Sequence, residues 1–240
     1  MIELLTNNHL EKILDLFDGA NRDIRIISPF LSVAMAQRLC DSIRERGLRC
    51  AFITRFYIED MVAKANSIDA LEMLLNAGVD LYAVKRLHTK LYLFDHDQAI
   101  VGSANFTTGG FKSNIELSLA IGDQPDLLSE LSGYFDDMEK KLKAADDGRV
   151  THEMIEKARA IYIYASQGMQ SSTSTSALIR CLSSLVPFTT SPRLNRKRQD
   201  REPVRLPILS FLFAYFSKSM CSVWLAFGLV FRCAIFTHPG

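Results

Sequence analysis

The stretch LHTKLYLFDHDQAIVGSANFT, residues 87–107, predicts two neighbouring strands of a sheet and carries an unusual set of polar side chains. Its first half is an apolar run of the kind found in central strands, and this run ends at Asp95. A polar turn at 95–98 leads into a second apolar run. Because strand side chains alternate, His88 and Lys90 lie on one face of the first strand, about 6.6 Å apart.

One imidazole and one ammonium that point into the same space suit a phosphate group. The histidine can attack phosphorus or carry a proton. The lysine can neutralise oxygens as negative charge builds in the transition state. Asp95 has the opposite parity to His88 and Lys90. We therefore expect Asp95 to orient or brace the site rather than to touch the substrate.

The second strand ends in a Gly-Ser-x-Asn turn. Ser103 and Asn105 share parity, so their hydroxyl and amide groups can be directed to one place, and Gly102 allows the backbone to approach closely. Further along, residues 115–121 alternate apolar with polar side chains, and Glu116 lies on the polar face. A carboxylate there can hold the Nδ1–H of an imidazole and so support an imidazolium.

These residues together resemble the signature of the phospholipase D superfamily, H-x-K-x4-D-x6-G-S-x-N. Every fixed position is filled at the right spacing, by His88, Lys90, Asp95, Gly102, Ser103 and Asn105. Glu116 falls where the superfamily has an acidic residue after the motif, and the segments ISPF (27–30) and ITR (53–55) look like early strands of the same domain. The resemblance covers about residues 1–165. It implies an α/β sandwich with a mixed central sheet flanked by helices.

The resemblance further implies cleavage of a phosphodiester without a metal or other cofactor. One histidine attacks phosphorus to form a phosphohistidine, and a second histidine protonates the leaving oxygen and then activates water. The superfamily needs two motifs per active site, whereas this chain has one, because none of the other histidines is followed by a lysine two residues later. The resemblance therefore predicts a homodimer in which two copies of the chain share one active site.

Two groups of residues are assigned on this basis. The predicted catalytic residues are His88, Lys90, Asp95, Asn105 and Glu116. The predicted substrate-binding residues are Gly102, Ser103 and Arg55, although Arg55 is also readable as a surface arginine. The neighbouring His96 and Asp97 are explained better by a polar hairpin turn than by a metal site.

Away from this stretch, the chain alternates between helical and strand patterns. Apolar residues at helical spacing, with stop signals, predict helices at 8–18, 33–45, 60–76, 125–144 and 151–164. Short apolar or β-branched runs predict strands at 24–30, 48–54, 79–84, 86–94, 99–105 and 115–121. Strands separated by helices are typical of an α/β sandwich with a mixed or parallel sheet.

The composition is that of a globular protein, with 48% hydrophobic and 23% charged residues. The start of the chain has no basic segment before its apolar residues, so no cleavable signal peptide is predicted and we expect a cytoplasmic protein. The five cysteines lack the spacing of a zinc site or of a disulfide framework, so buried free thiols are expected.

The net charge of +1 averages over two unlike parts of the chain. Residues 1–166 hold 19 basic and 25 acidic residues, a net charge of −6, and are expected to form the catalytic domain. Residues 167–240 hold nine basic and two acidic residues, a net charge of +7. Within them, 167–205 read as a Ser/Thr-rich and then basic linker, and 206–240 as an apolar tail.

The tail has two readings. Residues 206–231 are long enough to span a bilayer, and the preceding basic run would hold their N-terminal side in the cytoplasm. Lys218 in the middle would cost about 2.5–3.5 kcal/mol of insertion free energy. The tail is therefore either a membrane-associated segment or a sequence without selected structure.

Three functions remain open on the sequence. The single motif favours a nuclease, whose phosphate-binding groove would use cations such as Arg55, Lys85, Arg86, Lys90 and Lys112 against the overall negative charge of the domain. The apolar tail favours a phospholipid-cleaving enzyme held at a membrane. The third reading is an inactive or truncated assembly module.

Overall fold

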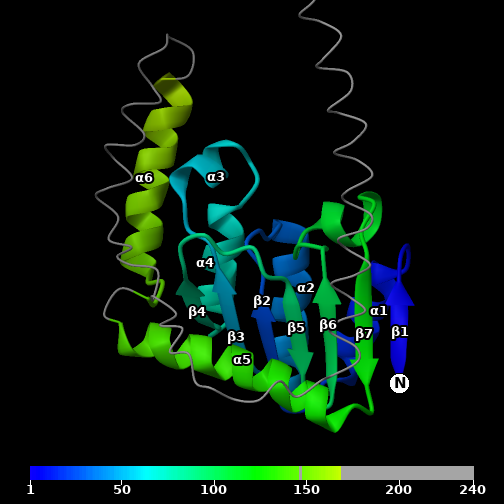
Figure 1. Ribbon diagram of the computed structural model, residues 1–240. Helices are drawn as coiled ribbons and strands as arrows, with labels where there is room; N and C mark the ends of the chain where they lie inside the picture. The colour runs from blue at the N-terminus through cyan, green and yellow to red at the C-terminus, as the bar shows by residue number, and fades with distance from the viewer. Residues whose placement is uncertain (146–147, 169–240) are drawn as a thin grey trace, which may run out of the picture. The chain divides into compact units, whose positions relative to one another are not determined.

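The computed structural model describes residues 1–145 and 148–168, which form a seven-stranded sheet with helices on both faces (Figure 1). The order of the strands across the sheet is β1-β7-β6-β5-β2-β3-β4. The strands are β1 (Ile2–Leu5), β2 (Asp23–Ile27), β3 (Arg49–Thr54), β4 (Asp80–Ala83), β5 (Leu91–Phe94), β6 (Gln98–Gly102) and β7 (Ser118–Gly122).

The sheet combines two kinds of pairing. Strands β2, β3 and β4 are parallel and are connected by helices. Strand β6 pairs antiparallel with both β5 and β7, β5 joins the first group by antiparallel pairing with β2, and β1 pairs antiparallel with β7. The predicted α/β architecture with a mixed central sheet is therefore confirmed.

The helices divide into two layers (Figure 1). They are α1 (His9–Gly19), α2 (Val33–Arg46), α3 (Ile58–Val62), α4 (Ile68–Asn76), α5 (Pro125–Ala144) and α6 (His152–Gly168). Apolar residues of α1, α2, α4 and α6 share one core cluster with Ile24, Ile26 and Tyr92 of the sheet. Helix α5 packs on the opposite face, where Phe135 lies in a second cluster with Leu91 and Leu93. Both faces of the central strands are thus buried, which explains their continuous apolar sequences.

The start of the chain was only partly predicted. Residues 2–5 form the edge strand β1, for which the sequence analysis predicted no strand. Its residues pair with β7, Ile2 opposite Ile121 and Leu5 opposite Ser118. A four-residue edge strand has too few alternating positions to stand out, so its assignment depended on a partner far along the chain.

The predicted helix at 60–76 is wrong in one respect, because it is two helices, α3 and α4. The carbonyl of Asp60 accepts hydrogen bonds from the backbone N–H groups of Ala65 and Asn66, which closes α3. Ser67 then caps α4 by accepting from the N–H of Ala70 at 3.2 Å. The serine three residues before Ala70 was the available sequence signal for this break.

The predicted strand at 86–94 is shorter than expected. Only Leu91–Phe94 form the ladder of β5, and His88 lies in the irregular segment that precedes it. Alternation nevertheless continues through this segment, because Leu87 and Leu91 both pack in the cluster beneath α5. The expected common face of His88 and Lys90 follows from that alternation.

The predicted linker and tail, 167–205 and 206–240, lie outside the described residues apart from the end of α6. Within residues 1–145 and 148–168, no helix is long and apolar enough to cross a membrane. Cys40 and Cys50 are buried free thiols, as predicted.

Gly102 marks a close approach between β6 and β7. It pairs with Ser118, and a Cβ atom on Gly102 would collide with the hydroxyl and Cα of Ser118 and with the carbonyl of Leu117. The glycine is therefore required by packing between strands rather than by its backbone angles. The sequence predicted a close backbone approach at Gly102, and the structure shows that the approaching segment is Leu117–Ser118.

We predict that Gly102→Ala lowers the free energy of unfolding by about 1–3 kcal/mol or more, because β7 must move to admit the methyl group. Urea denaturation of the full chain measures this change. Gly122→Ala is the matched control, since Gly122 lies at the other end of β7 and has no atom within 4 Å of its added Cβ. Equal stability of the two variants would contradict the close approach.

Candidate active site

The residues of the predicted site gather at one end of three adjacent antiparallel strands. His88 and Lys90 precede β5, Ser103 and Asn105 follow β6, and Glu116 precedes β7. Because β5 and β7 both run opposite to β6, the start of each lies beside the end of β6. Five of the predicted site residues therefore lie together at one end of these strands.

His88 and Lys90 are in direct contact. The Lys90 ammonium donates a hydrogen bond to the His88 carbonyl at 2.7 Å and lies 3.1 Å from Nδ1 of the imidazole. His88 is exposed, whereas Lys90 is buried, with 5% of its surface accessible. The His88 imidazole is therefore open to solvent, and the buried Lys90 ammonium contacts it from the protein side.

Lys90 lies in an environment that disfavours its charge. Burial lowers the pKa of Lys90, the carboxylate of Glu116 opposes this shift, and Arg55 adds to it. A phosphate placed against the ammonium would restore the lost solvation and stabilise the charged form. The site therefore suits an anionic ligand at the position above Lys90.

Glu116 is held by neighbours other than His88. Its carboxylate accepts hydrogen bonds from the Ser103 hydroxyl and from the Asn114 amide, the latter at 3.2 Å. The same Ser103 hydroxyl accepts from the N–H of Leu117 at 3.0 Å. Among the described residues, Nδ1 of His88 lies 3.1 Å from the Lys90 ammonium, so the support of an imidazole by Glu116 stays a prediction.

Asn105 carries a buried polar atom that lacks a protein partner among the described residues. Its side-chain Oδ1 is buried without a hydrogen bond, and its backbone carbonyl accepts from the N–H of Thr107 at 2.7 Å. The π-helical turn Gly109–Ser113 packs against it, with Gly110 beneath the Asn105 backbone. Because Oδ1 can only accept hydrogen bonds, it does not bind a phosphate oxygen; the predicted catalytic role of Asn105 would use its Nδ2 amide group as the donor.

Arg55 lies within electrostatic range of Lys90 but is already engaged. Its guanidinium donates to both carboxylate oxygens of Asp60, with Nε at 2.9 Å from Oδ2. It also lies over the rings of Phe30 and Tyr57. The edge of the guanidinium that faces Asp60 is occupied. If Arg55 contacts substrate as predicted, it must use another part of the guanidinium.

With this geometry established, comparison with known proteins is informative. A sequence profile of the family described as "Cardiolipin synthase, PLD-like domain" matches residues 13–139, more than half of the chain. The chain belongs to this phospholipase D-like family. The match spans all of the site residues named above.

Curated relatives cover part of the chain. Cardiolipin synthase A of Buchnera aphidicola subsp. Acyrthosiphon pisum (strain Tuc7) is 27% identical over 123 residues, which are 50% of this chain and 25% of that protein. The enzyme of the same name from Buchnera aphidicola subsp. Schizaphis graminum (strain Sg) is 26% identical over 118 residues, 48% of this chain and 24% of that protein. The chain thus matches about a quarter of the length of these relatives.

Solved structures of similar fold include two small proteins. The phospholipase D family member Nuc from Salmonella typhimurium is 21% identical with a TM-score of 0.48, and the match covers 57% of this chain and 93% of Nuc. NucT from Helicobacter pylori is 19% identical with a TM-score of 0.49, and the match covers 58% of this chain and 96% of NucT.

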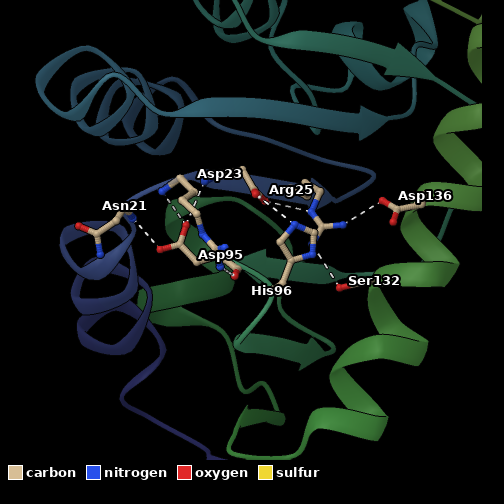
Figure 2. A network of polar contacts seen from close by, with 8 residues as sticks. Asn21, Asp23, Arg25, Asp95, His96, Ser132 and Asp136 are labelled. Atoms are coloured by element: carbon tan, nitrogen blue, oxygen red, sulfur yellow. Dashed lines mark hydrogen bonds and ion pairs between the residues drawn. The ribbon is translucent and has the colours of Figure 1, made fainter.

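The structure places Asp95 in a bracing position, as its parity predicted, and away from His88 and Lys90. Asp95 follows β5, at the end of the strand remote from Lys90, and faces the turn that enters β2 (Figure 2). Its carboxylate accepts hydrogen bonds from the backbone N–H groups of Asn21, Arg22 and Asp23 at 2.6 to 3.0 Å. Asp95 therefore fixes the connection between α1 and β2 and does not reach the phosphate-binding end of the sheet.

His96 and Asp23 extend this contact into a polar network around Arg25 (Figure 2). The buried Arg25 donates to Asp23, to Asp136 of α5 and to Nδ1 of His96, the last at 2.7 Å. This network ties the turn after β5 to β2 and α5. The reading of His96 and its neighbour as a structural hairpin turn agrees with these contacts.

Sequence analysis missed His9, the first residue of α1, because it belongs to no motif. The imidazole is 3% exposed, and its Nε2 lies 3.1 Å from the hydroxyl of Ser118, which in turn lies against Gly102. Burial lowers the pKa of His9, and Glu116 opposes the shift. No local pattern predicts this contact, since the two residues are 109 positions apart.

The contacts of Asp95 lead to a prediction about stability and pH. Burial raises the pKa of Asp95, but the three backbone N–H donors and Arg22 outweigh it, so the net shift is downward. A carboxylate whose folded pKa is lowered stabilises the fold above its unfolded pKa, and this stabilisation is lost as the pH falls through the folded pKa.

We therefore expect Asp95→Asn to lower the free energy of unfolding by about 2 kcal/mol at neutral pH. The difference from the wild-type protein should narrow as the pH falls below about 4. Chemical denaturation at several pH values measures both effects, with the exposed Asp97→Asn as the control from the same turn. A folded Asp95→Asn protein without activity would contradict the structural role.

Proposed function

We propose that the protein is a phosphodiesterase that needs no metal ion and that cleaves nucleic acid through a phosphohistidine. The observation that carries this proposal is the contact between the exposed His88 imidazole and the buried Lys90 ammonium, 3.1 Å from Nδ1 to Nζ. Membership of the phospholipase D-like family supports the same chemistry.

In the first step, a nitrogen of His88 attacks phosphorus and the bond from phosphorus to the leaving oxygen breaks. Before attack, the phosphate oxygens draw the Lys90 ammonium toward themselves and away from Nδ1, which releases the imidazole for reaction. Lys90 then neutralises the charge that builds on the oxygens, and the Asn105 amide donates a hydrogen bond to them. Ser103 and Glu116 are held beside these groups by their mutual hydrogen bond.

A second acid–base group must give a proton to the leaving oxygen and later take one from the attacking water. We assign this role to His88 of a second copy of the chain, placed across a two-fold axis. Water then breaks the phosphorus–nitrogen bond and frees the first histidine. The homodimer thus supplies two imidazoles, two ammonium groups and two asparagines to one phosphate.

Exposed cations beside the site favour a polyanionic substrate. Lys85 and Arg86 immediately precede the His88 segment, and Lys112 lies in the π-helical turn after Asn105. Such a group can bind the phosphates that flank the scissile bond, although residues 1–166 have a net charge of −6. Two copies in a dimer would double this local positive surface.

A phospholipid substrate is the second candidate, supported by two observations. The curated relatives are named as cardiolipin synthases. Beside Glu116, the side chains of Ile115 and Leu117 are exposed, which suits contact with acyl chains. Cleavage of anionic phospholipid vesicles, measured beside cleavage of DNA, distinguishes the two candidates.

We predict that His88→Ala reduces cleavage of DNA in EDTA by at least about a thousandfold, because the attacking nitrogen is removed. His152→Ala is the control, since His152 is an exposed histidine on α6 that contacts Asn76. Gel analysis of plasmid and single-stranded DNA measures the loss. Lipid cleavage without DNA cleavage would overturn the nuclease proposal in favour of the second candidate.

The shared active site makes a separate prediction. Mixing inactive His88→Ala with inactive Lys90→Ala should not restore activity, because each mixed dimer still lacks one imidazole and one ammonium. Co-expression of the two variants, followed by the cleavage assay, tests this. Recovery of activity close to that of the wild-type protein would contradict the requirement for all four side chains.

A further inference from the structure

A stack of three side chains lies beside the catalytic lysine. The guanidinium carbon of Arg55 is 4.7 Å from the centre of the Phe30 ring and 5.2 Å from the centre of the Tyr57 ring. All three side chains are half-buried, so each presents part of its surface to solvent. Phe30 follows β2, and Arg55 and Tyr57 follow β3, at the carboxyl ends of two parallel strands.

The stack is attached to both segments that carry site residues. On one side, the N–H of Phe106, next to Asn105, donates to the Ser28 hydroxyl at 2.9 Å, and the N–H of Ser32 donates to the Phe106 carbonyl at 3.1 Å. These bonds anchor the loop that contains Phe30. The loop therefore lies beside the segment of Asn105.

On the other side, the Tyr57 hydroxyl accepts the backbone N–H of Arg86 at 3.1 Å. Arg86 and the adjacent Lys85 are exposed cations two and three residues before His88. The stack thus spans the space between the His88 segment and the Asn105 segment. A ligand whose phosphate lies over Lys90 would extend from there toward either the His88 segment or the Asn105 segment, beside the stack.

Arg55 cannot serve as an ordinary phosphate clamp in this position. Asp60 accepts from Nε and Nη2, which neutralises the guanidinium and occupies that edge. Asn66, which is 4% exposed, donates to the Arg55 carbonyl at 3.0 Å and accepts from the N–H of Leu31 at 3.3 Å. Asn66 therefore fixes the loop after β2 to the loop after β3. The stack is held rigidly, and its planar groups are what a ligand could contact.

We propose that Phe30, Arg55 and Tyr57 form a subsite for an unpaired nucleobase next to the scissile phosphate. This inference rests on the proposed nuclease function. Nucleobases stack on aromatic rings and on guanidinium planes. Lys85 and Arg86 lie where they can bind the adjacent phosphate of the same strand.

The stack disfavours a lipid headgroup that carries an ammonium. Arg55 already occupies the cation-binding position over both rings, so an ammonium would find that position filled. A base in a duplex would have to leave its own stack before it could reach the subsite, at a cost in free energy. The subsite therefore selects single-stranded or locally unpaired nucleic acid.

The test compares a fluorescently labelled single-stranded oligonucleotide with a series in which one nucleotide at a time is abasic. Binding to the full chain is measured by fluorescence anisotropy, and cleavage of the intact oligonucleotide is measured separately in EDTA. The wild-type protein should bind the oligonucleotide with an abasic nucleotide at one position about tenfold more weakly than the intact one. Phe30→Leu and Tyr57→Leu should remove that difference.

Two further variants separate stacking from folding. Tyr57→Phe keeps the ring and should keep the base preference, whereas Tyr162→Leu changes a half-buried tyrosine of α6 and should also keep it. Because the preference is a ratio within one protein, partial unfolding of a variant lowers both affinities together and leaves the ratio readable.

The outcomes for the two proposals differ. Cleavage by the wild-type protein with no base preference, or with a preference that persists in Phe30→Leu and Tyr57→Leu, would overturn the subsite alone. Base preference without cleavage would overturn the nuclease function alone. Cleavage together with a preference that disappears only in the two leucine variants supports both.

Discussion

The register of β5, β6 and β7 is the constraint on which the site depends. Leu91 pairs with Val101, and Gly102 pairs with Ser118. This pairing places the start of β5, the end of β6 and the start of β7 side by side. The polar residues of three segments therefore lie together at one end of the strands. A shift of one residue would turn every side chain to the opposite face. The contact of Ser118 with Gly102 opposes such a shift, because only a glycine fits there.

Electrostatics at this edge follow from the packing. Tyr92, two residues after Lys90, is buried in the core beneath α1 and α2, and the same alternation carries Lys90 below the surface. The ammonium thereby loses solvent, while His88, two residues earlier, stays exposed. Under the proposed function, the buried ammonium would stabilise charge and the exposed imidazole would form the bond to phosphorus.

The opposite end of the sheet has a structural task. Asp95 there joins the turn after β5 to the start of β2, and Arg25 connects the same region to α5. Both contacts fix the end of β5 against its neighbour β2, at the end of the strand remote from His88 and Lys90. The aspartate of the motif therefore fixes the position of the strand and lies apart from the histidine and lysine of the same run.

The sequence by itself determined the α/β class, most helices and the common face of His88 and Lys90, because periodicity and local alternation are encoded by neighbouring residues. Periodicity left a mixed or a parallel sheet open, and the mixed sheet was implied by the resemblance to the family. It also determined the family through the spacing of one motif. Only the tertiary structure decided the place of Asp95, the partners of Glu116, the edge strand β1, the buried His9 and the stack around Arg55. Each of these depends on a contact between segments far apart in the chain or on which end of a strand faces the site. Local periodicity predicts neither long-range contacts nor the direction of a strand in the sheet.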